Sequence, residues 1–367
     1  MQDPVAVARA STKTPDIKRL LIVRLGAMGD VLHSLPAATA LREAFPEALL
    51  GWLIEERWAE LLCTLPTPRF GPRSRQRPLV DRIHAVNTKQ WRGDFWSYLT
   101  WERIAAGLSE LRAAKYEAAV DLQGAIRSAI LARLSRAPAI YGAAQPRENV
   151  ASMLYTHQVI THGAHVVEQN FSIAEAVIGN SLPVPQIELP YDDATEKECE
   201  LRLAERGIRD FALLNPGAGW GAKQWPVERY GQVAKQLLEN GLRSLVNFGP
   251  GEGGLAASVE RASGGAAAAI GSSLTQLIAL TRRARVFVGG DTGPLHLAAA
   301  LRVPVVAIFG PTNPARNGPF GTRAIVLRSP ASLTSHKRRS RPDEGLLEIT
   351  AAEVVDAVRA LLRLFCA

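Results

Sequence analysis

The stretch RLGAMGDVLHSLPA, residues 24–37, places two glycines and an aspartate directly after an apolar run. Glycines let a backbone bend tightly and let a ligand approach it closely. A phosphate at this helix start would be repelled by the carboxylate of Asp30, so the turn is a poor nucleotide cradle. Asp30 could instead accept a proton from a hydroxyl group, or it could simply cap a helix that we expect to begin at Val31. The local residues leave both interpretations open.

Residues 286–301, VFVGGDTGPLHLAAAL, have the features of a phosphate site. Thr292 is a natural N-cap, and the amides of Thr292, Gly293 and the rest of the first turn, with the positive end of the helix dipole, would hold a pyrophosphate. Asp291 precedes those amides and could accept hydrogen bonds from sugar hydroxyls. His296 would point from the first turn. An ordinary capped loop and a packed helix histidine are the alternatives.

Two further glycine-rich loops follow apolar runs, LLNPGAGWGAKQWP (residues 213–226) and NFGPGEGG (residues 247–254). In the first, Lys223 brings a positive charge suited to a phosphate, although a flexible loop with a solvated lysine would have the same sequence. In the second, Glu252 could hydrogen-bond ribose hydroxyls. A parallel sheet places all three loops of the C-terminal half at one edge, where ligands bind. We therefore predict a nucleotide diphosphate site there, facing Asp30 of the other half.

Metal-ligand patterns are missing from the sequence. It has no D-x-D motif, and its seven histidines lack H-E-x-x-H spacing, so we expect neither a bound metal nor a cofactor. Lys223 and helix amides would supply the positive charge for a leaving pyrophosphate. The three cysteines, Cys63, Cys199 and Cys366, have no C-x-x-C spacing, which argues against structural zinc and suits a reducing cytoplasm.

Apolar, strand-like runs alternate with alanine- and leucine-rich helical stretches along both halves of the chain. The predicted strands cover residues 19–25, 48–56, 116–124, 211–217, 243–249, 286–290 and 303–310. The predicted helices cover residues 31–45, 125–135, 227–241, 274–284, 293–302 and 350–365. This alternation predicts an α/β fold with parallel, doubly wound sheets. The segment GNSLPVPQIELPYDDAT, residues 179–195, has three prolines and little periodicity, and we expect the domain boundary there.

The composition is that of a soluble globular protein. The 367 residues are 47% hydrophobic and 21% charged, enough for two cores, and no apolar run approaches the roughly 20 residues that span a bilayer. The N-terminus lacks the pattern of a signal peptide. A net charge of +8 and a pI near 9.7 favour anionic partners, which include nucleic acid, anionic lipid and phosphorylated small molecules.

Two basic clusters, PRFGPRSRQRP (residues 68–78) and HKRRSRP (residues 336–342), are predicted to be surface loops with solvated charge. Five of the seven tryptophans fall in the N-terminal half. The stretch WRGDFWSYLTW, residues 91–101, has aromatic residues at mixed helical spacing, which more often belong to a core than to a ligand platform. Beside the basic loop, these aromatics could instead meet an anionic lipid surface.

Together these residues show a resemblance to the ADP-heptose:lipopolysaccharide heptosyltransferases, a GT-B glycosyltransferase family. MGDVLHSLPA, NPGAGWGAKQWP and GGDTGPLHLAAAL with VPVVAIFGPTNPARNGPFG resemble its hallmark segments in the expected order. The chain looks most like the heptosyltransferase I type, which adds the first heptose to a Kdo residue. The resemblance implies two Rossmann-like, doubly wound domains facing across a cleft. These are an acceptor-binding domain (residues 19–185) and a nucleotide-sugar-binding domain with a closing C-terminal helix (residues 186–367), after a flexible extension (residues 1–18).

The resemblance also implies roles for the residues picked out above. Asp30 is expected to be the catalytic base. Lys223 would contact the donor's phosphates and sugar, Glu252 its ribose, and Asp291 the heptose. The other donor-side residues would surround the pyrophosphate and sugar: Thr292, Gly293 and His296.

The sequence departs from the family at two positions, and two arginines match its acceptor site. Ala218 and Gly219 stand where some family members have hydroxyl residues, so backbone amides would make the phosphate contacts at Gly219. Arg127 and Arg147 lie where the family binds its phosphorylated, acidic acceptor.

The predicted reaction is a metal-independent, inverting transfer of heptose from ADP-L-glycero-D-manno-heptose to a Kdo residue of Kdo-lipid A. The family leads us to expect a monomer at the cytoplasmic face of the inner membrane, bound peripherally to an anionic membrane surface, with no nucleic acid partner. One alternative is another GT-B enzyme with a different nucleotide sugar, or a sugar-nucleotide epimerase. Another is a basic nucleic-acid-binding protein, although the sequence has no recognised motif for that role.

Overall fold

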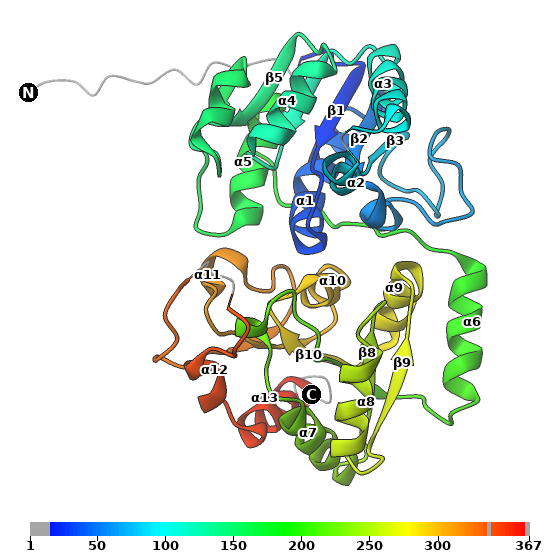
Figure 1. Ribbon diagram of the computed structural model, residues 1–367, viewed down its shortest axis with the longest axis vertical. Helices are drawn as coiled ribbons and strands as arrows, with labels where there is room; N and C mark the ends of the chain where they lie inside the picture. Colours follow the sequence, from blue (N-terminus) through cyan, green and yellow to red (C-terminus); the bar gives the residue numbers. More distant parts are fainter. Residues whose placement is uncertain (1–14, 95, 336–338, 364–367) are drawn as a thin grey trace, which may run out of the picture.

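Two six-stranded sheets, both entirely parallel, form the framework of the chain (Figure 1). The computed structural model describes residues 15–94, 96–335 and 339–363. Most of the predicted N-terminal extension, Cys366 and the first part of the second basic cluster therefore lie outside the described residues.

The strands of each sheet are contiguous in sequence. The N-terminal sheet contains β1 (Arg19–Val23), β2 (Leu49–Glu55), β3 (Arg82–Val86), β4 (Ala118–Asp121), β5 (Ala139–Ala143) and β6 (His157–Val159). The C-terminal sheet contains β7 (Phe211–Asn215), β8 (Arg243–Phe248), β9 (Ala267–Gly271), β10 (Val286–Gly290), β11 (Val305–Ile308) and β12 (Ala324–Leu327). The predicted α/β fold with doubly wound sheets is confirmed.

The two sheets have the same topology. Their strand orders are β3-β2-β1-β4-β5-β6 and β12-β11-β10-β7-β8-β9, so counting within each half gives the order 3-2-1-4-5-6 twice. In such sheets the strand order reverses between the first and fourth strands, and ligands bind in the crevice at that point. The crevices therefore lie beyond β1 and β4 in one half and beyond β7 and β10 in the other.

Helices cover both sheets. The N-terminal half has α1 (Met28–Ala44), α2 (Thr88–Gly93), α3 (Tyr98–Ala113), α4 (Ile126–Leu134) and α5 (Val166–Ile178), with the 3-10 helices η1 (Glu56–Leu61) and η2 (Asn149–Leu154). The C-terminal half has α6 (Asp193–Ala204), α7 (Val227–Glu239), α8 (Gly253–Ala262), α9 (Leu274–Arg283), α10 (Gly293–Ala300), α11 (Pro314–Asn317), α12 (Glu344–Glu348), α13 (Ala351–Arg363) and η3 (Gly221–Lys223). Among the described residues, no helix has the length and apolar character to cross a bilayer.

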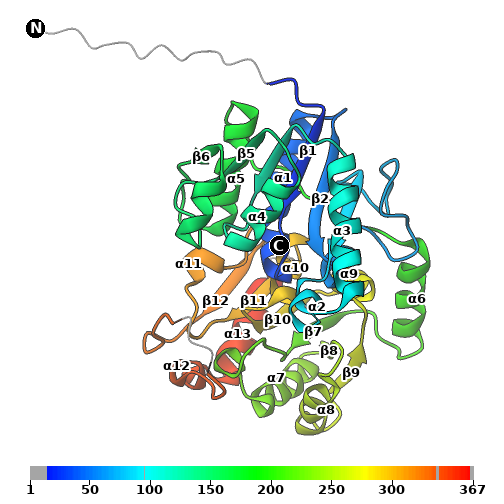
Figure 2. The ribbon, with the colours of Figure 1, turned by 45° about the horizontal axis from the view of Figure 1, so that its top comes forward.

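Helix α1 connects the two halves through its packing. It contacts α5 of its own half and α10 of the other half, and the views in Figures 1 and 2 agree on this neighbourhood. The helix begins at Met28, so the predicted start at Val31 is wrong by one turn. The reason is that Asp30 lies inside the first turn, where its Oδ2 accepts the Ala27 N–H at 3.0 Å and stabilises the helix start from there.

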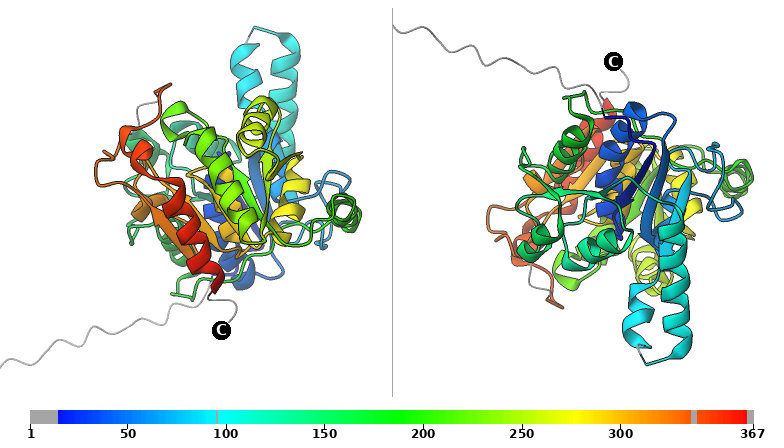
Figure 3. Two further views of the ribbon diagram at one scale, coloured as in Figure 1. Left: turned by 90° about the horizontal axis from the view of Figure 1, so that it is seen from below. Right: turned by 90° about the horizontal axis from the view of Figure 1, so that it is seen from above.

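The aromatic stretch around Trp96 does not belong to the core. Trp52 is fully buried on β2, but the side chain of Trp96 is 94% exposed and that of Trp101 is 48% exposed. Figure 3 shows α2 and α3 standing out from the body of the protein as a hairpin. The prediction of core aromatics is therefore wrong at these two positions, because the hairpin carries them beyond the sheet.

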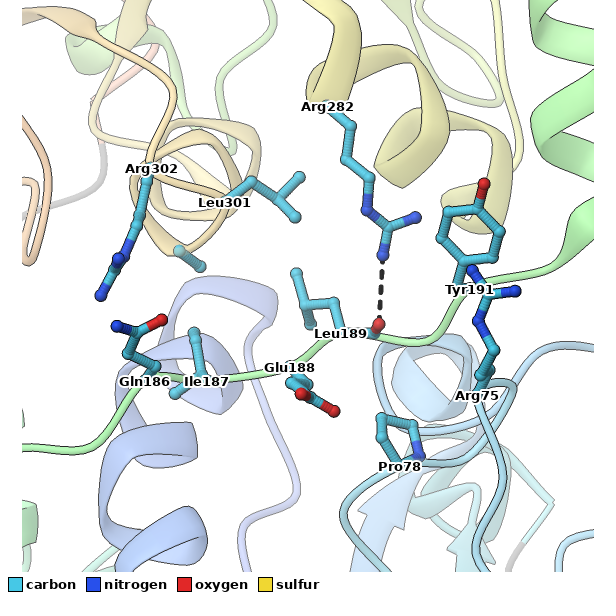
Figure 4. A pocket seen from close by; sticks show the side chains of 11 residues that line it. Arg75, Pro78, Gln186, Ile187, Glu188, Leu189, Tyr191, Arg282, Leu301 and Arg302 are labelled. Carbon is cyan, nitrogen blue, oxygen red and sulfur yellow. Dashed lines mark hydrogen bonds between the residues drawn. The ribbon is translucent and has the colours of Figure 1, made fainter.

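The basic loop at residues 68–78 is not simply solvated. The buried Arg77 donates to the Pro72 carbonyl oxygen at 2.7 Å, and the Arg75 guanidinium lies 4.1 Å from the centre of the Tyr191 ring. Tyr191 belongs to the extended connection between α5 and α6, and Arg282 of α9 donates to Leu189 of the same connection at 3.1 Å (Figure 4). Arginines from both halves thus hold the segment that joins them.

Candidate active site

A pocket of about 280 Å³ lies between the first turn of α1 and the loops that follow β7 and β10. These loops end at the ligand-binding edge of each sheet, so topology alone brings the lining residues together. The pocket contains these predicted site residues: Asp30, Gly219, Lys223, Asp291, Thr292, Gly293 and His296. Three lining residues that the sequence did not point to are His33, Trp220 and Asn317.

The first turns of α1 and α10 touch across this pocket, and two glycines allow it. A Cβ at Gly29 would lie 2.5 Å from Cδ2 of His296, and a Cβ at Gly293 would lie 2.5 Å from Sδ of Met28. Any larger residue at either position would push the two helices apart. Gly293 therefore allows the two halves to approach each other closely. The sequence suggested only that its backbone amide would be open to a phosphate.

Asp30 faces the pocket from the N-terminal half. Its Oδ1 lies 2.8 Å from a guanidinium nitrogen of Arg24, while its Oδ2 accepts the Ala27 N–H. The Arg24 side chain is buried at the end of β1 and also donates to the Leu122 carbonyl oxygen, so it is a fixed partner. The carboxylate nevertheless keeps 39% of its side-chain surface exposed. It is held in one orientation with lone pairs still open to the pocket, as a proton acceptor needs.

Asp291 faces the same pocket from the C-terminal half, but it is buried. Its Oδ1 lies 3.1 Å from Nε2 of His296 and its Oδ2 lies 2.6 Å from Nζ of Lys223. Burial alone would raise the pKa of Asp291, yet the hydrogen bonds and charges of His296 and Lys223 outweigh it and hold that pKa well below its usual value. Asp291 is thus an ionised anchor for two other side chains.

Lys223 is not the mobile, solvated lysine that the loop sequence allowed. Its side chain is only 15% exposed, and its Nζ also donates to the Asp291 carbonyl oxygen at 3.2 Å. The ammonium group lies 5.3 Å from the centre of the Trp220 ring. Lys223 is therefore a preoriented positive charge at the pocket wall.

Two histidines extend this network to the N-terminal half. Nε2 of His33 lies 3.1 Å from Nδ1 of His296. Nε2–H of His296 donates to Asp291 Oδ1, and Nδ1 of His296 shares a hydrogen with Nε2 of His33. Burial, then the neighbouring His296 and His165, lower the pKa of His33 well below its usual value, in keeping with a neutral ring. His33 thus joins the acceptor side of the pocket to Asp291.

His165 forms a second contact between the halves. Its Nδ1 accepts the Val167 N–H at 3.2 Å at the start of α5, and its Nε2 donates to the Gly318 carbonyl oxygen at 3.0 Å. Burial is the main cause of a lowered pKa at His165. Nothing in the sequence around this residue indicated such a role.

The start of α10 presents backbone amides to the pocket. Thr292 occupies the N-cap position as predicted, but its hydroxyl does not cap the helix and donates instead to the Gly290 carbonyl oxygen at 3.3 Å. The hydrogen bond from His296 N–H to Thr292 O, at 3.4 Å, belongs to the first turn of α10. The amides before it have no partner within the helix and, with the helix dipole, favour an anion.

Glu252 lies at the same sheet edge, beside this pocket rather than in its lining. Its Oε2 accepts the Gly249 N–H at 3.1 Å, and a Cβ at Gly217 would lie 2.6 Å from its Oε1. The carboxylate thus rests against the loop after β7. Its predicted contact with a ribose stays a prediction.

Arg127 and Arg147 do not line the pocket that contains Asp30. Arg127, in the first turn of α4, donates to Thr88 Oγ1 at 2.8 Å. Arg147 is exposed in the loop after β5. Because β4 is the neighbour of β1, Arg127 shares a sheet edge with Asp30, but the structure places both arginines farther along that edge.

The segment of residues 339–343 packs behind the loop that follows β7. Ala222 donates to the Arg339 carbonyl oxygen at 3.1 Å and accepts the Asp343 N–H at 3.2 Å. A Cβ at Gly221 would lie 1.9 Å from the Ser340 carbonyl oxygen. These contacts hold η3, which carries Lys223. The basic sequence of this segment gave no sign of them.

Metal-ligating side chains do not gather in the part of the chain that the structure describes. No group of three or more His, Cys, Asp or Glu side chains in that part could hold a metal ion. Lys223 and the α10 amides bring positive charge to the pocket.

Comparison with known proteins identifies the family. The family model described as glycosyltransferase family 9 (heptosyltransferase) matches residues 104–346. The chain belongs to this family. It is 31% identical over 323 residues to lipopolysaccharide heptosyltransferase 1 of Pseudomonas aeruginosa, covering 85% of this chain and 84% of the relative. It is also 26% identical to lipopolysaccharide heptosyltransferase 3 of Escherichia coli, covering 91% of this chain and 96% of that relative.

Solved structures agree with this assignment. The E. coli heptosyltransferase WaaC with ADP superposes with a TM-score of 0.75 at 26% identity, covering 94% of this chain and 99% of that one. WaaC with ADP-2-deoxy-2-fluoro heptose gives a TM-score of 0.74, also at 26% identity, over 93% and 99% of the two chains. The predicted GT-B arrangement of two doubly wound halves is confirmed, and the family does not favour the nucleic-acid alternative.

Proposed function

We propose that the chain transfers heptose from ADP-L-glycero-D-manno-heptose to a Kdo residue of the lipopolysaccharide inner core, as a heptosyltransferase I. The relative at 31% identity is a type 1 enzyme, and WaaC has been solved with ADP and with an ADP-heptose analogue. The observation that carries the proposal is the pocket itself. An accessible carboxylate, Asp30, faces a preoriented lysine and a helix N-terminus across the interface of the two halves.

In the proposed reaction the acceptor hydroxyl oxygen attacks the anomeric carbon of the donor heptose. Asp30 takes the hydroxyl proton as the new carbon–oxygen bond forms, while the bond between the anomeric carbon and the β-phosphate oxygen breaks. The electron pair leaves with ADP, whose growing charge Lys223 and the α10 amides stabilise. Attack from the face opposite ADP inverts the configuration in one displacement.

The donor site is proposed to work without a metal ion. A bound metal can neutralise the charge of a leaving diphosphate. Here Lys223, which Asp291 holds at the pocket wall, would neutralise that charge. Glu252 would hydrogen-bond the ribose and Gly219 would offer its backbone to the phosphates. His296 and Asp291 would orient the sugar.

The cellular setting follows from the acceptor. Because lipid A resides in a membrane, we propose that the chain acts as a monomer bound peripherally to the cytoplasmic face of the inner membrane. Its net charge of +8 would favour an anionic membrane surface.

The donor part of the proposal is tested by titrating the protein with ADP, UDP, GDP and CMP without added metal. We expect selective binding of ADP, weakened by Lys223→Ala and by Glu252→Ala. Lys235→Ala, at an exposed position of α7, is the matched control and should bind ADP normally. Preference for another nucleotide would mean that the donor sugar is carried by that nucleotide instead of ADP. Binding of none would rule out the proposed donor site.

The acceptor part is tested by release of ADP from ADP-heptose. We expect release that depends on a Kdo-containing acceptor and fails with an acceptor that already carries the first heptose. Release that depends only on the heptosylated acceptor would assign a later step of core assembly.

A further inference from the structure

An apolar groove of about 530 Å³ runs along the N-terminal half between α3 and α4. Its walls are mainly large apolar side chains, with α2 closing one side. These are Trp91, Ile104, Leu108, Ile130, Leu131 and Leu134. The volume lies in the range of small-molecule sites, which are mostly apolar with a few polar groups. Neither the proposed reaction nor the pocket at Asp30 uses this groove.

The polar residues of the groove gather at one end. Thr88, Arg127 and Glu148 are its polar lining residues. Arg127 donates to Thr88 Oγ1 at 2.8 Å, and Glu148 accepts the Ile126 N–H at 2.9 Å, so all three lie at the N-terminus of α4. The groove thus has a polar end and an apolar end, as a site for an amphiphile needs.

The polar end lies on the side of the reaction site. Helix α4 follows β4, and β4 pairs with β1, which leads into the turn of Asp30. Both helix starts therefore lie at the same edge of the sheet, beyond the point where its strand order reverses. The apolar end, near Leu134, lies about 12 Å farther along α4, since that helix rises 1.5 Å per residue.

The surface beside the groove is also apolar and cationic. On α4, Ile126 is 37% and Ile130 44% exposed, and on the adjacent η2, Met153 is 79% exposed. Helix α4 contributes the exposed Arg127 and Arg133, and its sequence contains no acidic residue. Exposed apolar residues in such a setting mark an interaction site, and Arg127, at the polar end, suits an anionic head group.

We propose that this groove binds an acyl chain of the lipid-linked acceptor, with the phosphorylated sugar end directed past Arg127 toward Asp30. The inference rests on the proposed function, because it assigns the lipid part of the proposed acceptor to a second site. It also gives Arg127 a place in acceptor binding although that residue does not line the Asp30 pocket.

The experiment compares two acceptors, Kdo-lipid A in mixed micelles and the same molecule with all acyl chains removed. Leu108→Trp fills the groove, and Ala106→Trp places the same side chain at an exposed position of α3 as the control. We expect Leu108→Trp to raise the KM for the acylated acceptor at least tenfold. Its KM for the deacylated acceptor and its ADP affinity should stay within twofold of the unmodified protein.

A second pair of variants guards against a folding defect at Leu108. Ile130 is half-exposed at the groove wall, so Ile130→Glu should fold while placing a charge beside the acyl chain, and Ile130→Leu should restore the normal KM. Equal changes in KM for the acylated and deacylated acceptors, or no change for either, would overturn the proposal.

A binding measurement separates this proposal from the proposed function. Lysophosphatidic acid, a single acyl chain with an anionic head, is titrated below its micelle concentration into the unmodified protein and into Leu108→Trp. We expect binding that Leu108→Trp weakens at least tenfold and Ala106→Trp does not. This result needs no turnover, so it stands even if neither acceptor receives heptose, whereas equal binding by all three proteins overturns the groove assignment.

Discussion

The two halves of the molecule meet at two aspartates that follow similar glycine turns. Asp30 comes after β1 in GAMGD, and Asp291 comes after β10 in GGDTG. Yet the Asp30 side chain is 39% exposed, with one arginine as ion-pair partner, whereas that of Asp291 is 7% exposed and holds both His296 and Lys223. Similar turns on sheets of one topology thus leave one carboxylate partly open to the pocket and bury the other between a lysine and a histidine.

This difference shows that a motif fixes where a carboxylate lies but not what it can do. The oxygens of Asp291 are occupied by a lysine and a histidine, so taking a proton would disrupt two buried partners. Asp30 has a single ion-pair partner, Arg24, and its own carboxylate is partly open to the pocket.

The largest expected effect is on turnover in Asp30→Asn. Removing a general base should lower kcat by about 10²–10⁴, because the acceptor hydroxyl keeps its proton during attack. The free energy of unfolding should also fall, by about 1–3 kcal/mol, because the buried Arg24 loses its counter-charge but keeps the Leu122 carbonyl oxygen as a partner. Acceptor-dependent ADP release and a urea titration measure the two quantities. Near-normal turnover with intact ADP binding would show that Asp30 is not the base.

Asp291→Asn should have its main effect on stability. The change leaves the partly buried Lys223 without its counter-charge, and we expect the free energy of unfolding to fall by about 3 kcal/mol. The double variant Asp291→Asn with Lys223→Met should recover much of that loss, because no unpaired charge remains. Urea unfolding of the four proteins of this cycle provides the measurement. Losses that simply add would mean that the pair is not coupled.

Gly29→Ala tests whether the two aspartates need the close contact of their helices. The new methyl carbon would lie 2.5 Å from the His296 ring, and relieving this overlap should cost about 1–3 kcal/mol, seen as reduced stability and turnover. Gly107→Ala is the control, because a Cβ there meets nothing within 4 Å and alanine favours a helix interior. If both variants behave alike, the contact has no importance for activity.

The smallest effect is a pH dependence that arises from His33. Its pKa is lowered in the folded protein, so the unfolded chain binds the extra proton first as pH falls below about 6.5. The free energy of unfolding should therefore fall between pH 7 and pH 5, and His33→Gln should reduce the slope by up to about 1.4 kcal/mol per pH unit. The exposed His157 on β6, changed to Gln, is the control. An unchanged slope in His33→Gln would contradict the neutral, buried assignment.

The sequence predicted the sheets because their strands are short apolar runs between glycine turns, as in VFVGG at β10. It also predicted seven of the residues that line the pocket, since loops after parallel strands meet at one edge. The start of α1 was misplaced, because Gly29 and Asp30 are typical of a turn, whereas Asp30 caps the helix from inside its first turn and Gly29 contacts α10.

Contacts between distant residues were beyond sequence reasoning. His33 and His296 are 263 positions apart, and their hydrogen bond depends on how the two halves dock. The same holds for the segment behind Ala222, whose basic sequence resembles a solvated loop. Arg127 was selected by resemblance, and only the structure reveals the apolar groove beside it.

The meeting of α1 and α10 has a consequence for domain motion. Each helix carries roughly half a positive elementary charge at its N-terminus, and these two ends face each other across the interface. With no anion between them they repel, apart from the compensation that Asp30 and Asp291 provide. A diphosphate held at the α10 amides, as proposed, would neutralise that end, so the charge of the occupant would change the interaction between the two halves. Salt, which screens such charges, should then oppose closure around the donor.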